Sequence, residues 1–374
     1  MTSTYRLEAG SGGPNAALVT LLRQLMERSL ADAVLVPCRL PHGTGIAQTL
    51  VTGPAMLERA DPLAPVMPVN SARILSTMTK VEASHRKVAA VLRPCELRAL
   101  VELVKLKQAR LDNLLLIGTD CLGTYPMSGY DEMLKQGVSP LGRVMASRLN
   151  GRDDPALREA CRTCEYPYPL VADIVVGLWR QDANGPVLLI GKTPQGDDVL
   201  ASLGLAATDR SEAREEALAE TIAQRVEARD ALFKTTLEES YGHEKLLATL
   251  STCINCHNCR DACPICYCRE CIFDSPTFQW EGDRYTNWAS RRGALRMPTD
   301  TLLFHLTRMN HMATSCVGCG LCSEACPNDI PVSRLFRLVG FRTQAALDYV
   351  PGRSLDDELP LTTFREDEFQ ELGQ

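Results

Sequence analysis

Two stretches, CINCHNCRDACP at residues 253–264 and CVGCGLCSEACP at residues 316–327, decide the class of this protein. Each stretch has three cysteines separated by two residues, then a fourth after three more residues, directly before a proline. This is the bacterial ferredoxin spacing, in which short gaps let three thiolates of one tight loop face a cube of iron and sulfide. Zinc sites use two CxxC pairs instead, which disfavours zinc. The duplicated run therefore predicts two [4Fe–4S] clusters.

The fourth cysteine of each run is expected to bind the cluster of the other run, as it does in two-cluster ferredoxins. One cluster is therefore assigned to Cys253, Cys256, Cys259 and Cys326. The second is assigned to Cys316, Cys319, Cys322 and Cys263. The interval of 52 residues between Cys263 and Cys316 is wide for a compact ferredoxin. We expect it to hold its own helices, one of them over residues 301–312.

Three more cysteines, Cys266, Cys268 and Cys271, follow the first run directly. One interpretation is a further metal site that lacks one ligand unless Cys38 or a partner chain supplies it. The favoured interpretation is that these are buried thiols packed beside the clusters. A redox-active thiol pair is a third, less favoured one.

Composition narrows the class of protein further. The 374 residues are 45% hydrophobic and carry a formal net charge of −6, which disfavours nucleic acid as the main partner. No apolar run approaches the roughly 20 residues of a membrane-spanning helix. The polar N-terminus lacks the pattern of a signal peptide, so the expected compartment is the cytoplasm. Sixteen cysteines in a reducing compartment indicate metal ligation or redox work.

The first half of the chain has the pattern of an α/β domain. Apolar strand-like runs at residues 87–92 and 113–118 flank a helical pattern at 97–108, which predicts a parallel βαβ unit. Residues 172–179 and 187–190 are expected to form a hairpin, and residues 212–234 a long helix. We therefore expect an α/β (α+β) flavin and cluster domain followed by a mostly helical two-cluster ferredoxin domain. The expected bounds are 1–205 for the first domain, 206–245 for a connecting helix, 246–340 for the ferredoxin domain and 341–374 for a C-terminal tail.

The N-terminal cysteines follow strands of this expected sheet. Cys95 and Cys121 each come directly after a strand, and Cys161 and Cys164 form a CxxC pair further along the chain. The carboxyl ends of parallel strands meet at one edge, so Cys95 and Cys121 are expected to converge there. The pair Cys161 and Cys164 could complete a set of four thiolates. Scattered cysteines are also often plain core residues, and the spacing alone leaves that alternative open.

These motifs in this order resemble the beta subunit family of coenzyme F-420-reducing hydrogenase and formate dehydrogenase. The resemblance covers about residues 65–205 and rests on Pro94-Cys95, Gly118-x-x-Cys121, Cys161-x-x-Cys164 and Ala172-Asp-Ile-x-x-Gly177. It implies that this domain holds a third [4Fe–4S] cluster and FAD, and that a hydride passes between the flavin and a deazaflavin coenzyme. The C-terminal ferredoxin runs resemble the formate dehydrogenase branch. Hydrogenase-type members carry their ferredoxin motif at the N-terminus, whereas residues 1–64 here contain only Cys38.

The resemblance implies an oxidoreductase subunit that is active only with partner subunits. It implies as partner a catalytic subunit of the molybdenum or tungsten pterin type or a hydrogenase, or heterodisulfide reductase-like subunits. The hydride carrier stays open between the deazaflavin coenzyme, NAD(P)H and none. Flavin contacts are assigned to Asn70, Arg73 and Lys80, with helix capping or surface exposure as the alternative. No catalytic residue is assigned.

Two functions follow from these observations. The leading hypothesis is an iron–sulfur flavoprotein that converts a two-electron hydride into single electrons and conducts them to a partner. The alternative is a flavin-free relay and docking subunit. A flavin absorption band in the purified chain would separate them.

Overall fold

The computed structural model describes residues 3–179, 185–208, 212–268, 270–278, 282–294, 297–298, 300–360 and 362. Its N-terminal domain is built on an eight-stranded mixed sheet with the order β3-β2-β4-β5-β6-β7-β1-β8. The strands are β1 (Thr4–Leu7), β2 (Ala33–Arg39), β3 (Ile46–Val51), β4 (Val88–Leu92), β5 (Leu114–Thr119), β6 (Ile174–Gly177), β7 (Val187–Gly191) and β8 (Ala206–Ala207).

Parallel pairing occupies the middle of this sheet. Strands β2, β4, β5 and β6 pair in parallel, and β4 and β5 are joined by helix α3 (Pro94–Lys105). The predicted βαβ unit is thus confirmed, as is the antiparallel pairing of β6 with β7. Strand β1 was not predicted, because a polar four-residue segment has no strand signal of its own; it pairs with β7 and β8.

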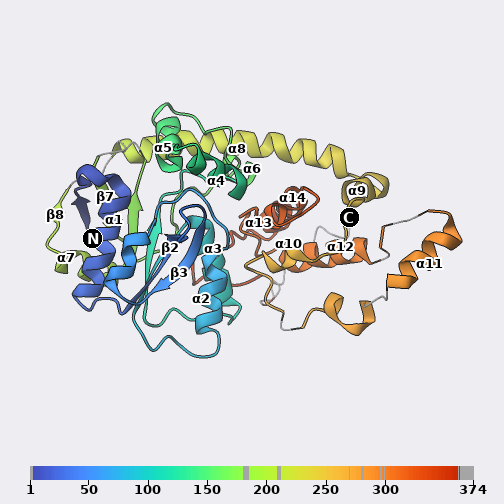
Figure 1. Ribbon diagram of the computed structural model, residues 1–374, viewed down its shortest axis with the longest axis horizontal. Coiled ribbons are helices and arrows are strands. Elements are labelled where there is room, and N and C mark those ends of the chain that lie inside the picture. Colours follow the sequence, from blue (N-terminus) through green and yellow to red (C-terminus); the bar gives the residue numbers. More distant parts are fainter. Residues whose placement is uncertain are drawn as a thin grey trace.

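Helices cover both faces of the sheet (Figure 1). One face packs on α1 (Gly13–Glu27), α4 (Met127–Lys135) and α5 (Pro140–Leu149). Leucines 18, 21, 22 and 25 of α1 are almost fully buried there, and burial of such a side chain stabilises the fold by about 1.5–3 kcal/mol. The other face packs on α2 (Ser71–Thr79) and α3. The side chains of β2 alternate between the two cores, as a strand requires.

The second half of the chain is mostly helical, which confirms the expected fold class. Helix α8 (Glu212–Ser240) runs along one side of the molecule from the sheet domain to the ferredoxin region (Figure 1).

The remaining helices of the described chain are α6 (Glu159–Arg162), α7 (Pro194–Ser202), α9 (His243–Leu250), α10 (Asn258–Asp261), α11 (Gly282–Arg292), α12 (Thr301–Met312), α13 (Leu321–Glu324) and α14 (Val332–Ala346). Short 3-10 turns lie at Gly10–Gly12, Pro54–Arg59, Ile272–Asp274 and Pro276–Phe278.

A single apolar core joins the two domains. Leu97 and Leu100 of α3 belong to the same buried cluster as Phe304 of α12 and Phe336 of α14. Helix α14 continues to Ala346, beyond the boundary expected at residue 340. The chain after it returns to α3, where the Tyr349 hydroxyl and the Gly352 N–H both donate to Glu102. Within the described residues, no helix is long and apolar enough to cross a membrane.

Candidate functional site: three sets of cysteines and the cavity beside them

The structure brings the first predicted set of cysteines together. Cys253, Cys256, Cys259 and Cys326 line one cavity, beside His257, Phe304 and His305. Cys326 comes from the second run, so the cavity joins two loops with 52 residues of chain between them. Cys256 is exposed and Cys259 is buried, which places this cavity at the molecular surface.

The second predicted set lines a separate cavity. Cys263, Cys316, Cys319 and Cys322 face it together with Arg308, Met312 and Phe336. In the ranges that the structure describes, no three or more His, Cys, Asp or Glu side chains are arranged to hold a metal ion. The thiols of each set surround a space instead, which fits a cluster of several iron and sulfide atoms.

The two runs have the same local backbone. Asn255 and His257 have φ angles of 58° and 60°, and Gly318 and Gly320, at the matching positions of the second run, have 70° and 75°. These left-handed residues turn the chain between successive cysteines. Each run then enters a four-residue helix, α10 or α13, that ends shortly before the fourth cysteine and its proline.

Buried polar groups surround the first set. An Arg308 guanidinium nitrogen, Nη1, donates to the Cys259 sulfur at 3.1 Å, and His305 Nε2 lies 3.4 Å from the Cys253 sulfur. Burial lowers the pKa of His305 to about 4, so its imidazole is neutral at pH 7. His257 lies on Phe304 with ring centroids 4.3 Å apart and pairs with Asp274. No sequence pattern places Arg308 or His305 beside the first set, because both lie on α12, more than forty residues after that run.

The four N-terminal cysteines lie close to one another, although they come from three segments. Cys95 opens α3, Cys121 follows β5, and Cys161 and Cys164 lie in and directly after α6. Burial, together with the neighbouring Cys161 thiolate, raises the pKa of Cys121 to about 11. Burial also raises the pKa of Cys95, with added contributions from Glu96, Cys121, Cys319 and Cys164. Cys319 belongs to the second ferredoxin set, so these two sets are neighbours.

Arg158 makes this third set a suitable host for an anionic cluster. Its Nε donates to the Thr124 hydroxyl at 2.7 Å, and its Nη2 lies 3.7 Å from the Cys161 sulfur. Burial works to raise the pKa of Cys161, but the charge of Arg158 and hydrogen bonds from Thr124 together outweigh it, and the pKa is lowered. Arg158 Nη1 is buried and has no hydrogen-bond partner among the described residues. Four converging thiols and a buried, incompletely paired cation fit a group that is negatively charged.

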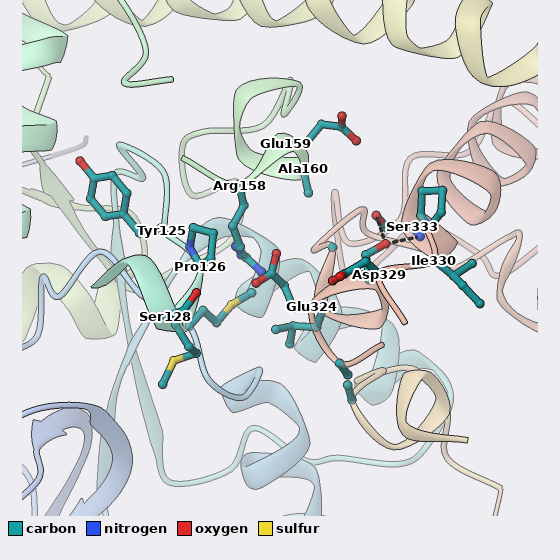
Figure 2. A pocket seen from close by; sticks show the side chains of 18 of the residues that line it. Tyr125, Pro126, Ser128, Arg158, Glu159, Ala160, Glu324, Asp329, Ile330 and Ser333 are labelled. Carbon is teal, nitrogen blue, oxygen red and sulfur yellow. Dashed lines mark hydrogen bonds between the residues drawn. The ribbon is translucent and has the colours of Figure 1, made fainter. Parts of the chain in front are cut away.

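A cavity of about 640 Å³ lies between the sheet domain and the ferredoxin region (Figure 2). Tyr125, Ser128 and Arg158 line it from the sheet domain, and Gly320, Glu324 and Ser333 from the ferredoxin region. Figure 2 shows the Arg158 side chain reaching toward Glu324. At the same cavity Arg334 pairs with Glu159, its Nε and Nη2 donating at 2.7 and 2.6 Å. Cavities of this volume hold cofactor-sized molecules.

The residues assigned to flavin contacts lie elsewhere. Asn70 caps α2, because its side-chain oxygen accepts from the Ala72 N–H at 3.1 Å. Arg73 and Lys80 are exposed at the same helix. None of the three lines the cavity between the domains. Asn70 therefore caps a helix, which is the alternative to a flavin contact.

The additional cysteines are divided between the two domains. Cys38 is buried in β2, in the sheet. Cys266 lies near Cys263, and burial, with that neighbour, raises its pKa to about 11. Cys268 is exposed. The structure does not bring Cys38 to the string from Cys266 to Cys271.

Comparison with known proteins identifies two regions of the chain. Residues 85–216 match the family model for the C terminus of the coenzyme F420 hydrogenase/dehydrogenase beta subunit, and residues 249–330 match the 4Fe-4S dicluster domain. These two matches cover the third cysteine set and the two ferredoxin runs.

Curated relatives match along nearly the whole chain. The chain is 27% identical to the F420-dependent formate dehydrogenase subunit beta of Methanocaldococcus jannaschii, over 92% of this chain and 93% of the relative. It is 29% identical to the F420-dependent formate dehydrogenase 1 subunit beta of Methanococcus maripaludis, over 95% and 94%. A chain in a solved structure of the F420-reducing [NiFe] hydrogenase complex from Methanosarcina barkeri aligns with a TM-score of 0.47 and 10% identity, over 65% of this chain and 94% of that chain.

Proposed function

Because the chain belongs to the family of F420 hydrogenase and formate dehydrogenase beta subunits with a C-terminal 4Fe-4S dicluster domain, we propose that it couples hydride exchange at a flavin to one-electron transfer. The flavin is FAD, and the electrons pass through three [4Fe–4S] clusters. They travel to or from a catalytic partner such as a formate dehydrogenase alpha subunit or a heterodisulfide reductase-like complex. The names of the relatives favour formate as the partner's substrate and the deazaflavin coenzyme F420 as the hydride carrier.

One observation carries this proposal. The cavity between the domains is bounded by Arg158, which contacts the third cysteine set, and by Gly320, which lies inside the second ferredoxin run. Ala262, next to Cys263, also lines it. A flavin bound there lies beside the third set and the second ferredoxin set. When bound, a flavin supplies the conversion between a two-electron hydride and one-electron carriers.

The chain's own residues give this cavity its character. Arg158 provides a buried positive charge with a free N–H, which suits an anionic or carbonyl-bearing ligand. The ion pair of Arg334 with Glu159 closes part of the wall and joins the two domains. The second and first ferredoxin sets continue from the cavity toward the exposed Cys256, so electrons leave for the partner at that end.

The test is flavin content in the anaerobically purified full-length chain. Ser128 is an exposed residue of α4 at the rim of the cavity, so Ser128→Trp fills the cavity without disturbing the core. We expect this variant to lose most of the flavin absorption band while its iron content stays unchanged. Lys135→Trp, on the same helix but away from the cavity, is the matched control and should keep its flavin. A wild-type chain that carries its iron but binds no flavin would favour the flavin-free relay instead.

A further inference from the structure

The gap between the two ferredoxin sets contains a buried arginine. Arg308 of α12 is 4% exposed and lines the cavity of the second set. Its Nη1 donates to the sulfur of Cys259, which belongs to the first set, and its Nη2 donates to the Cys259 carbonyl at 3.1 Å. The guanidinium therefore lies between the two predicted clusters.

A second buried arginine occupies the gap between the second ferredoxin set and the N-terminal set. Arg158 is 5% exposed, and its Nη2 approaches the Cys161 sulfur. Burial alone would lower the pKa of Arg158, but the thiolate of Cys161 raises it, followed by Glu324, Cys95 and Cys319. Its neighbours thus belong to two different cysteine sets.

Most other buried arginines near the cysteines have an acidic partner, and the exception, Arg98, donates to the carbonyls of Pro351 and Val317. Arg225 pairs with Asp153, Arg337 with Glu165, and Arg93 with Glu96. In the part of the chain that the structure describes, neither Arg158 nor Arg308 has an Asp or Glu oxygen at ion-pair distance, and each has one guanidinium nitrogen without a partner. Glu324 acts on Arg158 from beyond ion-pair distance, and a buried charge without a close counter-charge is strongly destabilising. The negative groups within hydrogen-bond distance are the cysteine sulfurs.

We propose that Arg158 and Arg308 are counter-charges of the clusters. Arg158 raises the reduction potential of the N-terminal cluster, and Arg308 raises that of the first ferredoxin cluster. This inference rests on the three-cluster content of the proposed function. Reduction of a cluster adds one negative charge to an anionic site, and the potential depends on net charge and on hydrogen bonds to sulfur. A fixed cation at a ligand sulfur stabilises the reduced state more than the oxidised state. The two arginines thus act through the reduction potentials of the clusters. They bring the potentials of neighbouring clusters close enough for electrons to pass between those clusters.

The test is an anaerobic redox titration of the full-length chain, followed by electron paramagnetic resonance. Arg158→Met and Arg308→Met remove the charge, and Arg158→Lys and Arg308→Lys retain it. We expect each Met variant to lower the equilibrium constant for reduction of its own cluster by at least about tenfold. For one electron this lowers the reduction potential by about 59 mV, while the potential in each Lys variant stays near that of the wild type. Arg353→Met, which removes an arginine paired with Asp357 outside the cavity and the cysteine sets, is the control and should leave both potentials unchanged.

Iron per chain is measured in every variant. A deficit of about one cluster in a Met variant, with the Lys variant fully loaded, also supports the counter-charge role. The counter-charge role would be overturned if the wild type and the Lys and Met variants had the same cluster potentials. It would also be overturned if the Lys variant showed the same shift in potential, or the same loss of iron, as the Met variant. Failure of the proposed function differs from both results, because the wild-type chain would then lack the N-terminal cluster or the flavin.

Discussion

Cys326 is the residue whose position most directly reflects how the two ferredoxin runs share their ligands. It is the fourth cysteine of the second run but lines the cavity of Cys253, Cys256 and Cys259. We expect Cys326→Ser to damage the cluster of the first run and to leave that of the second run intact. Electron paramagnetic resonance of the reduced variant distinguishes the two. Loss of the Cys316, Cys319 and Cys322 cluster instead would mean that each run closes its own site.

Gly320 combines a cluster loop with a contact between domains. Its φ is +75°, and a Cβ at this position would lie 2.4 Å from the Ala160 Cβ of α6. Gly320→Ala is therefore expected to destabilise the protein by about 2–4 kcal/mol, from backbone strain and overpacking together. Gly318→Ala is the control, since its φ is similar but its nearest neighbour is the flexible end of Arg337. Thermal unfolding should show a smaller loss at Gly318, and equal losses would show that the domain contact is not tight.

At the scale of elements, α8 is held to the sheet domain by arginines rather than by an apolar stripe. Arg214 pairs with Asp120, the residue before Cys121, and Arg225 pairs with Asp153. Arg225 also donates to the carbonyl of Leu122, the residue after Cys121. These buried pairs fix the loop that carries Cys121.

Arg225→Met is expected to destabilise the folded chain by about 1–3 kcal/mol, because it removes the hydrogen bonds of a buried guanidinium to Asp153 and to the Leu122 carbonyl, while Asp153 keeps its ion pair with Arg148. The measurement is chemical denaturation of the cluster-loaded chain. Arg353→Met, which breaks the exposed pair with Asp357, is expected to cost at most about 1 kcal/mol. Similar losses in the two variants would contradict the role of α8 as an anchor.

The elements differ in how far the sequence predicts them. Helix α12 and the unit of β4, α3 and β5 were predictable, because their apolar residues have clear helical or strand periodicity. Strand β1 was not, because its pairing depends on β7, nearly two hundred residues away. The cysteine sets follow from spacing and resemblance. Arg308 and the cavity between the domains could not be predicted, since tertiary packing alone brings α12 to the first run and α6 to α13. Arg158 lies only three residues before Cys161, but no motif marks it.

At the scale of the whole molecule, the two domains form one path rather than two independent modules. Arg98 of α3 links them: it donates to the carbonyls of Val317 and Pro351 and lies over the Tyr166 ring. Cys95 and Cys319 are near enough for each charge to affect the other, so the third set adjoins the second. The first set, with the exposed Cys256, lies at the end of this path. The arrangement fits transfer from a flavin site at the domain boundary to a partner at the ferredoxin surface.

The most direct test of this account is the order in which the cofactors of the full-length chain are reduced. Hydride donors deliver two electrons and clusters accept one at a time, and the proposed flavin would convert between them. A soluble hydride donor, either the reduced deazaflavin coenzyme or NAD(P)H, is added anaerobically to the flavin-loaded chain, and the visible spectrum is followed in time. The account predicts that the flavin band bleaches first and the cluster absorption after it. Flavin-loaded protein that no soluble hydride carrier can reduce or reoxidise would contradict it.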